Sequence, residues 1–221
     1  MGIISVEHAD RLLWLGRYSE RVYTTLRLFA KYFDSMIELN GEEYERFCKS
    51  QDIPNIYSSI EDFTNRYCFD GNDPNSIYSN LMRAYDNAIV LREEIGSETL
   101  AYIQLAVYAM NKASVSDAPL VKLQRVIDNI VAFWGIADDS IDSDNVRDLI
   151  KLGKRIERLD IYSRLKMDSE ELKREMKRLN VRIATANIRY SHKGLMHLNY
   201  LVEEDSLDYE EIVKEVEALI Q

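Results

Sequence analysis

Apolar residues recur every three or four positions along most of this chain, which is the spacing of one face of an α-helix. Over residues 6–38 the stripe consists of Leu12, Leu15, Val22, Leu26, Phe29, Phe33 and Ile37. The same spacing predicts one or two short helices within 42–66 and further helices over 76–94, 98–112, 120–136, 145–165, 169–189, 194–203 and 209–220. Strand-like alternation is scarce, so we predict an all-α fold, a helical bundle with short up-down connections.

Short polar segments separate the predicted helices. The stretch YCFDGNDPNS (67–76) is predicted to be a loop, and Gly96 within IGSE is predicted to end one helix. ADDSIDSDN (137–145) reads as an acidic linker in which Ser143 or Asp144 caps the next helix. With 221 residues, 8 Gly and 3 Pro, the chain is expected to form a single domain, 1–221, of long helices.

One helical pattern occurs twice. LLWLGRYSER (12–21) and LIKLGKRIER (149–158) share the form Leu-[Leu/Ile]-x-Leu-Gly-[Arg/Lys]-x-x-Glu-Arg. The interval between them is too long for a solenoid repeat, so we expect a duplicated Glu-Arg helix in two related halves. A glycine inside a helix costs about 1 kcal/mol relative to alanine. Since Gly16 and Gly153 recur at the same edge of the stripe, we expect another helix or a ligand to approach the backbone there.

The repeated helix also places a glutamate at the border of the predicted core. Glu20 and Glu157 need a partner there, because an unpaired carboxylate is costly to bury. We expect Arg27 and Arg164, on the same flank, to lie close to them across a pseudo-twofold axis. The two helices would then pack together and form one polar site.

Two interpretations of this layout remain open. In the first, the glycine contacts and Glu-Arg pairs only hold a duplicated bundle together. In the second, they line a cleft that holds a carboxylate or a phosphate, because arginine binds such groups in a bidentate manner and a glutamate can hold it in position.

The charge and composition of the chain limit the classes of partner that it is expected to bind. The formal net charge of −10 makes binding to nucleic acid unfavourable. The sequence contains no run of 18 apolar residues, so we expect no membrane span. Cys48 and Cys68 show neither metal-site spacing nor a disulfide framework, so we expect a cytoplasmic protein. Trp14 lies away from the apolar stripe and is a candidate contact for a partner. The sequence leaves a homo-oligomer open.

Few residues suggest a metal. Asp138, Asp139 and Asp142 match the D-D-x-x-D pattern with which helical isoprenoid synthases hold Mg²⁺ and a diphosphate. A second acidic motif is missing, so they are weak candidates, and a linker with a helix cap is the main interpretation. None of the three histidines follows a glutamate by three residues, as a di-iron bundle requires. We expect no cofactor and no tightly bound transition metal.

Three segments together resemble the alpha-E family, a bacterial all-helical family named for its Glu-Arg motif. They are residues 6–36, 73–106 and 133–166, and they contain both repeat copies and the middle motif S-I-x-x-x-L-x-x-A-x-x-N-A-x-x-[VL]-R-E. The resemblance implies that the Glu-Arg motif falls on Glu20-Arg21 and Glu157-Arg158. The middle motif supplies Ser76, Arg83, Asn87, Arg92, Glu93 and Glu98.

We expect Arg83, Asn87 and Arg92 of the middle motif to line the same cleft as the Glu-Arg helices. We expect residues 166–221 to match the family poorly. The first copy carries Val22-Tyr23 where members have alanine and an acidic residue, whereas the second keeps Leu159-Asp160.

The resemblance also implies a function. Family members are encoded beside, or fused to, circularly permuted ATP-grasp ligases and transglutaminase-like proteins. We therefore expect a non-catalytic accessory component of an amide-forming peptide synthesis or modification system, which binds the ATP-grasp ligase, its peptide substrate, or both. One alternative is an enzyme that acts on a carboxylate or acyl-phosphate in the Arg/Glu cleft. Another is a helical protein that binds Mg²⁺ and a diphosphate.

Overall fold

The computed structural model describes residues 4–38 and 42–221, with only the helical backbone at 30–38 and 42. This part of the chain is all-α, as the spacing predicted, with an isolated bridge between Tyr190 and Ile220. The helices are α1 (Val6–Glu38), α2 (Glu42–Ser50), α3 (Ile60–Phe69), α4 (Ile77–Val90), α5 (Arg92–Ser114), α6 (Pro119–Lys122), α7 (Gln124–Ser140), α8 (Asp144–Arg164), α9 (Ser169–Thr185), α10 (His192–Glu203) and α11 (Tyr209–Glu217).

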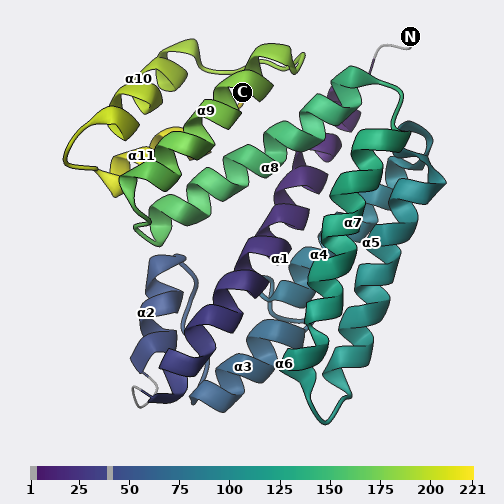
Figure 1. Cartoon of the computed structure of the whole chain (residues 1–221), viewed down its shortest axis with the longest axis vertical. Coiled ribbons are helices and arrows are strands. Elements are labelled where there is room, and N and C mark those ends of the chain that lie inside the picture. Colours follow the sequence, from purple (N-terminus) through teal and green to yellow (C-terminus); the bar gives the residue numbers. More distant parts are fainter. Residues whose placement is uncertain (1–3, 39–41) are drawn as a thin grey trace.

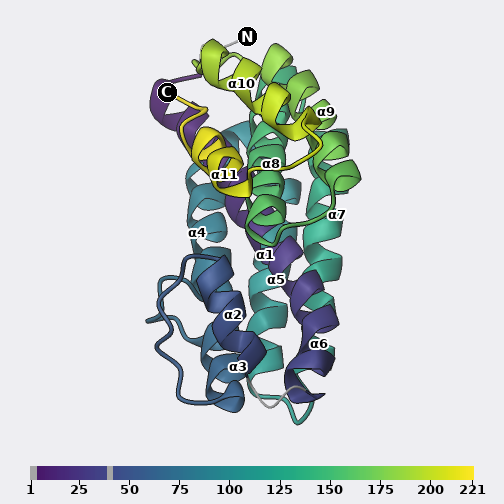
Figure 2. The ribbon, with the colours of Figure 1, turned by 90° about the vertical axis from the view of Figure 1, so that its left-hand side faces the viewer.

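Helices α1 and α8 cross at the centre of the molecule (Figure 1). Helix α1 packs on α8 and on α4, while α5 packs on α7 and α4 to complete the bundle. Helices α9, α10 and α11 form a separate layer over α8 at one end, and α2 and α3 lie at the other end (Figure 2). The duplicated helix is therefore the element that joins the C-terminal layer to the bundle.

The apolar stripes face the core. On α1 the stripe is buried from Leu12 to Phe29, and the side chains of Phe33 and Ile37 lie outside the described residues. On α8 the matching stripe is buried at Leu152, Ile156 and Leu159. Across the described ranges, no helix is both long enough and apolar enough to cross a membrane.

Two predicted boundaries need correction. Helix α4 ends at Val90 instead of residue 94, and α5 begins at Arg92. Gly96 does interrupt the helix as predicted, because its φ of 77° is not helical and divides the short start of α5 from its longer part. Glycine tolerates this left-handed conformation, so the helix resumes after a single residue. The predicted acidic linker is mostly helix, because α7 runs to Ser140. Ser143 occupies the N-cap position of α8, without a capping hydrogen bond from its side chain.

The crossing of α1 and α8 depends on two glycines. A Cβ atom at Gly16 would lie 2.0 Å from the Ile150 carbonyl oxygen, and one at Gly153 would lie 2.0 Å from the Leu13 carbonyl oxygen. Leu13 and Ile150 occupy equivalent positions in the two repeat copies. The contact is thus reciprocal, as a local twofold relation requires, and what approaches each glycine is the backbone of the other copy.

We predict that Gly16→Ala or Gly153→Ala lowers the free energy of unfolding by at least about 2 kcal/mol, because the methyl group forces the two backbones apart. Gly135→Ala on α7 is the matched control, since a Cβ atom there would meet nothing within 4 Å. That control is expected to gain up to about 1 kcal/mol from helix propensity. Urea denaturation measures all three variants, and equal stability of Gly16→Ala and Gly135→Ala would contradict the close crossing.

Candidate functional site

Each glutamate of the repeated motif pairs with an arginine of the other copy. Glu20 Oε1 accepts a hydrogen bond from Arg158 Nε at 2.6 Å. Glu157 accepts one from Arg17 Nε at 2.8 Å, on Oε2, and another from Arg21 Nε, on Oε1. Both glutamate side chains are fully buried. We call the Glu20–Arg158 and Glu157–Arg21 contacts the crossed Glu-Arg pairs.

The expectation that Arg27 and Arg164 pair with the glutamates is wrong. Arg27 donates to the Tyr23 hydroxyl at 3.0 Å, and Arg164 pairs with Asp160 at 3.1 Å. These arginines lie about 10 Å further along their helices than the glutamates. Glu20 and Glu157 lie near the crossing of the two helices. Arg21 and Arg158, which directly follow them, are therefore close enough to contact the other copy, whereas Arg27 and Arg164 are not. Tyr23 and Asp160 hold equivalent positions, so the two copies bind their later arginine differently.

Electrostatics keep the Glu157 pair ionised. Burial works to raise the pKa of Glu157, but the Arg21 and Arg17 guanidinium groups outweigh it and the pKa is lowered. The pKa of Arg21 is raised, because Glu157 outweighs its burial. Burial and the charge of Glu157 raise the pKa of neighbouring Asp160, although the charge of Arg164 acts to lower it. A buried carboxylate is thus held charged by two arginines.

The Glu20 side of the crossing is covered by α9. Its buried Glu175 pairs with Arg155 at 2.9 Å and lies 3.8 Å from Arg158. Glu20 Oε1 also accepts from the Thr24 hydroxyl at 2.6 Å, while its Oε2 is buried without a hydrogen-bond partner among the described residues.

Lys154, which takes the place of Arg17 in the second copy, also lies on the Glu20 side. Its Nζ sits 3.9 Å from the centre of the Trp134 ring. Burial lowers the pKa of Lys154 to about 8, against the opposing charge of Glu20. The second copy therefore replaces a guanidinium that binds a carboxylate by an ammonium packed on an aromatic ring.

On the Glu157 side a polar cleft of about 200 Å³ opens between α1, α8, the segments flanking α3 and the end of α11. The charged residues of its walls are Arg17, Arg21, Arg164, Asp52, Glu157, Asp160 and Glu217, and its amide side chains are Gln51, Asn75 and Asn80. The Nε2 atom of Gln51 is buried without a partner in the described part of the chain. The cleft thus combines cations, anions and an unused hydrogen-bond donor.

The Trp14 ring packs against the guanidinium group of Arg17, which lines the cleft. The ring lies 4.5 Å from the Arg17 guanidinium carbon and 5.0 Å from the Tyr18 ring, all on α1. The side chain is half-buried rather than fully exposed. The structure thus gives Trp14 a role in supporting Arg17, and its contact with a partner stays a prediction.

The middle-motif residues do not line this cleft. Arg83 reaches back to the Pro74 carbonyl oxygen at 2.8 Å, and Asn87 accepts from Arg11 at 3.3 Å. Arg92 donates to the Ser97 hydroxyl at 3.2 Å at the exposed start of α5. Asn87 lies further along α4 than Asn80, so it faces another part of α1. Asn75, in the loop before α4, and Asn80, in the first turns of α4, fill the place expected for Arg83 and Asn87.

The three aspartates of the D-D-x-x-D pattern do not converge. Asp138 pairs with Lys151 of α8, and α7 continues through Asp139, so these residues are not a flexible acidic loop. Within the described ranges, the metal-ligating side chains that come together, with ligand atoms within 4.8 Å of one another, are instead His197, Glu211 and Glu215. The sequence showed Glu211 and Glu215 one helical turn apart, but not that a histidine from α10 joins them.

Comparisons with known proteins give one match. The model of the Alpha-E family, described as a predicted alpha-helical domain with a conserved ER motif, matches residues 7–199. The match covers both copies of the Glu-Arg motif and also residues 166–199, beyond the segments that carried the resemblance. Among curated proteins and among solved structures, nothing matches.

We predict that Glu157→Gln lowers the free energy of unfolding by about 3–5 kcal/mol at pH 7, because Arg17 and Arg21 lose a buried counter-charge. The lowered pKa of Glu157 also fixes the pH dependence. Its stabilising effect is present above the ordinary value of 4.5 and is lost as the pH falls through the lower folded-state value. The difference between wild type and variant should therefore shrink below about pH 4.5 in urea titrations.

Glu217→Gln is the control for this measurement. Glu217 pairs with Arg164 but is 56% exposed, so its loss should cost less than about 1 kcal/mol. A difference between wild type and Glu157→Gln that stays constant on acidification would contradict an ionised Glu157.

Proposed function

The chain belongs to the Alpha-E family, and on that premise we propose that it is a non-catalytic accessory component of an ATP-grasp-type, amide-forming peptide system. In this proposal the polar cleft binds the carboxylate end of the peptide substrate and presents it to the ligase. The association with the ligase comes from the family resemblance, and the carboxylate site comes from the geometry of the cleft.

The observation that carries the proposal is the arrangement of Arg17 and Arg21 around Glu157. Both arginines use Nε for the glutamate, which leaves their terminal nitrogens for a ligand. Two guanidinium groups and one carboxylate sum to a charge of about +1, which one ligand carboxylate would neutralise. Because Glu157 fixes both side chains beforehand, binding costs less side-chain entropy.

The other walls of the cleft suit a peptide more than an inorganic anion. Asp52, Asp160 and Glu217 outweigh the charge of Arg164, so this part of the lining would repel a phosphate and accept an amide or an ammonium group. Gln51 offers its unpartnered Nε2 to a carbonyl oxygen. A mixed surface of this kind matches the alternating donors and acceptors of a peptide backbone.

The cleft favours binding over catalysis. Among the described residues that line it, the hydroxyl groups are those of Thr25 and Tyr67, and histidine, cysteine and serine are absent. The two cysteines are buried elsewhere, and burial raises the pKa of the Cys48 thiol to about 11, which makes it a poor nucleophile. The proposed role is therefore to hold a substrate while the ligase supplies ATP and the chemical step.

We predict that Arg21→Gln weakens binding of fluorescein-labelled peptides with a free C-terminal carboxylate by at least about tenfold, the usual effect of a lost charge-assisted contact. Arg158→Gln is the matched control, because it removes the equivalent crossed pair on the covered Glu20 side. Fluorescence polarisation measures both, using a small peptide library and its C-terminal amide counterpart. Equal binding of acids and amides, or equal loss in both variants, would contradict a carboxylate site in the cleft.

A second measurement tests the accessory role. The purified ATP-grasp ligase is assayed for ATP consumption and amide product with and without this protein. The proposal expects faster product formation with wild type and not with Arg21→Gln. Product formation by this protein alone, or a ligase rate that is unchanged by it, would overturn the accessory role while leaving the peptide-binding test intact.

A further inference from the structure

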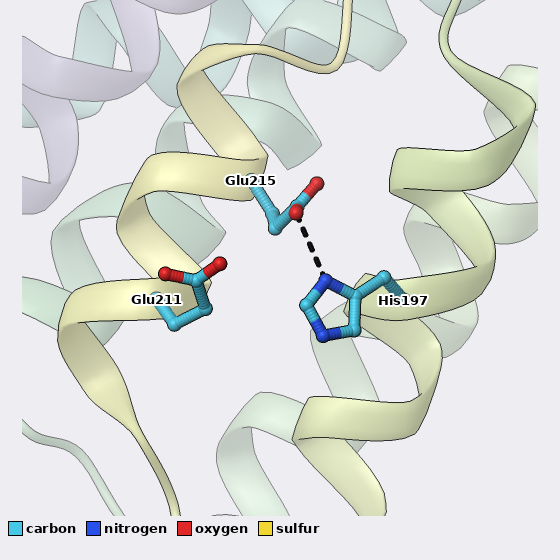
Figure 3. Close-up of side chains that lie close together, drawn as sticks. All are labelled: His197, Glu211 and Glu215. Atoms are coloured by element: carbon cyan, nitrogen blue, oxygen red, sulfur yellow. Dashed lines mark hydrogen bonds and ion pairs between the residues drawn. The ribbon is translucent and has the colours of Figure 1, made fainter.

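A histidine and two glutamates meet between the last two helices, outside the residues that line the cleft (Figure 3). His197 extends from α10, and Glu211 and Glu215 extend from α11. His197 Nδ1 lies 2.9 Å from Glu215 Oε1, and one ligand atom from each of the three side chains lies within 4.8 Å of the others.

The backbone places these side chains. Glu211 and Glu215 lie four residues apart, so they project from the same face of α11. Helix α10 packs on α11, and Gly194 lies one turn before His197. A Cβ atom at Gly194 would lie 3.0 Å from Glu215 Oε2, so the glycine makes room for that carboxylate. The convergence follows from helix packing as well as from side-chain rotamers.

The local charge is unbalanced. Lys214 pairs with Glu211 at 3.1 Å, but the lysine side chain is 74% exposed, and such a surface pair is weak. Glu215 has His197 as its partner, and an imidazole adds positive charge only when it is protonated. Among the described residues, the cation paired with these two carboxylates is the solvated Lys214, and a divalent cation would neutralise the charge that remains.

We propose that His197, Glu211 and Glu215 form a binding site for a divalent transition-metal ion, with Zn²⁺ as the best match. One imidazole nitrogen and two carboxylate oxygens are ligands that Zn²⁺ accepts, and a water molecule completes a tetrahedral site. Bonds of about 2.0–2.2 Å place ligand atoms roughly 3.5 Å apart, so closure requires shifts of about 1 Å. All three side chains are partly exposed, so such shifts are accessible.

The site would join α10 to α11 and thereby fix the C-terminal layer. Helix α11 packs on α8 and carries Glu217, which pairs with Arg164. A ligand that binds the folded state stabilises it in proportion to the logarithm of its concentration. Zn²⁺ is therefore expected to raise the melting temperature of the full chain.

The test is isothermal titration calorimetry of the full chain with Zn²⁺, Co²⁺ and Mg²⁺, together with thermal melts with and without Zn²⁺. We expect one saturable Zn²⁺ site per chain, with Co²⁺ next and Mg²⁺ far weaker, because an imidazole ligand favours transition metals. His197→Gln and Glu215→Gln should each weaken Zn²⁺ binding at least about tenfold and remove the melting shift.

His8→Gln is the matched control, because His8 pairs with Glu94 alone and belongs to no group of three ligands in the described part of the chain. It should bind Zn²⁺ as wild type does. Circular dichroism without metal checks that each variant is folded. Equal Zn²⁺ affinity in wild type and His197→Gln, binding of Mg²⁺ as tight as that of Zn²⁺, or no saturable binding would overturn the proposal.

Discussion

The contact between the backbones of α1 and α8 at Gly16 and Gly153 is the constraint on which the rest of the structure depends. It sets how closely the duplicated helices approach and which residues face each other. At this distance Arg21 reaches Glu157, and Arg158 reaches Glu20. A side chain at either glycine would separate the helices and move both arginines away from their carboxylates.

Burying these charges is not by itself a route to high stability. Desolvation of a carboxylate and a guanidinium offsets most of their attraction, and a well-packed apolar pair is often as stable. What the crossed Glu-Arg pairs provide is register, because any other crossing would leave charges buried without partners. Helix α9 covers the Glu20 side through Glu175, whereas the Glu157 side remains open. Among the described residues, the symmetrical motif is therefore covered on its Glu20 side and opens into a polar cleft on its Glu157 side.

Local spacing predicted the helices, the duplication and a close approach at the glycines, because these features are encoded within one helix at a time. It did not predict the arginine that each glutamate uses, since that choice depends on where the helices cross. Arg27 was expected because it lies on the same flank of the helix as Glu20, but the crossing near Gly16 brings Arg21 to Glu157 instead. The cleft amides and the His197 cluster come from separate elements, so tertiary packing alone reveals them. For Asp138 and Asp139 the sequence predicted a linker, but α7 continues through both residues.

The most direct test of the crossed arrangement is a pair of double-mutant cycles read by urea denaturation. One cycle combines Glu157→Gln with Arg21→Gln, and the other combines Glu20→Gln with Arg21→Gln. The structure predicts a coupling energy of about 1–3 kcal/mol for Glu157 with Arg21, which lie in different helices, and less than about 0.5 kcal/mol for the sequence neighbours Glu20 and Arg21. Strong coupling within Glu20-Arg21 and none between Glu157 and Arg21 would contradict the crossed pairs and the cleft built on them.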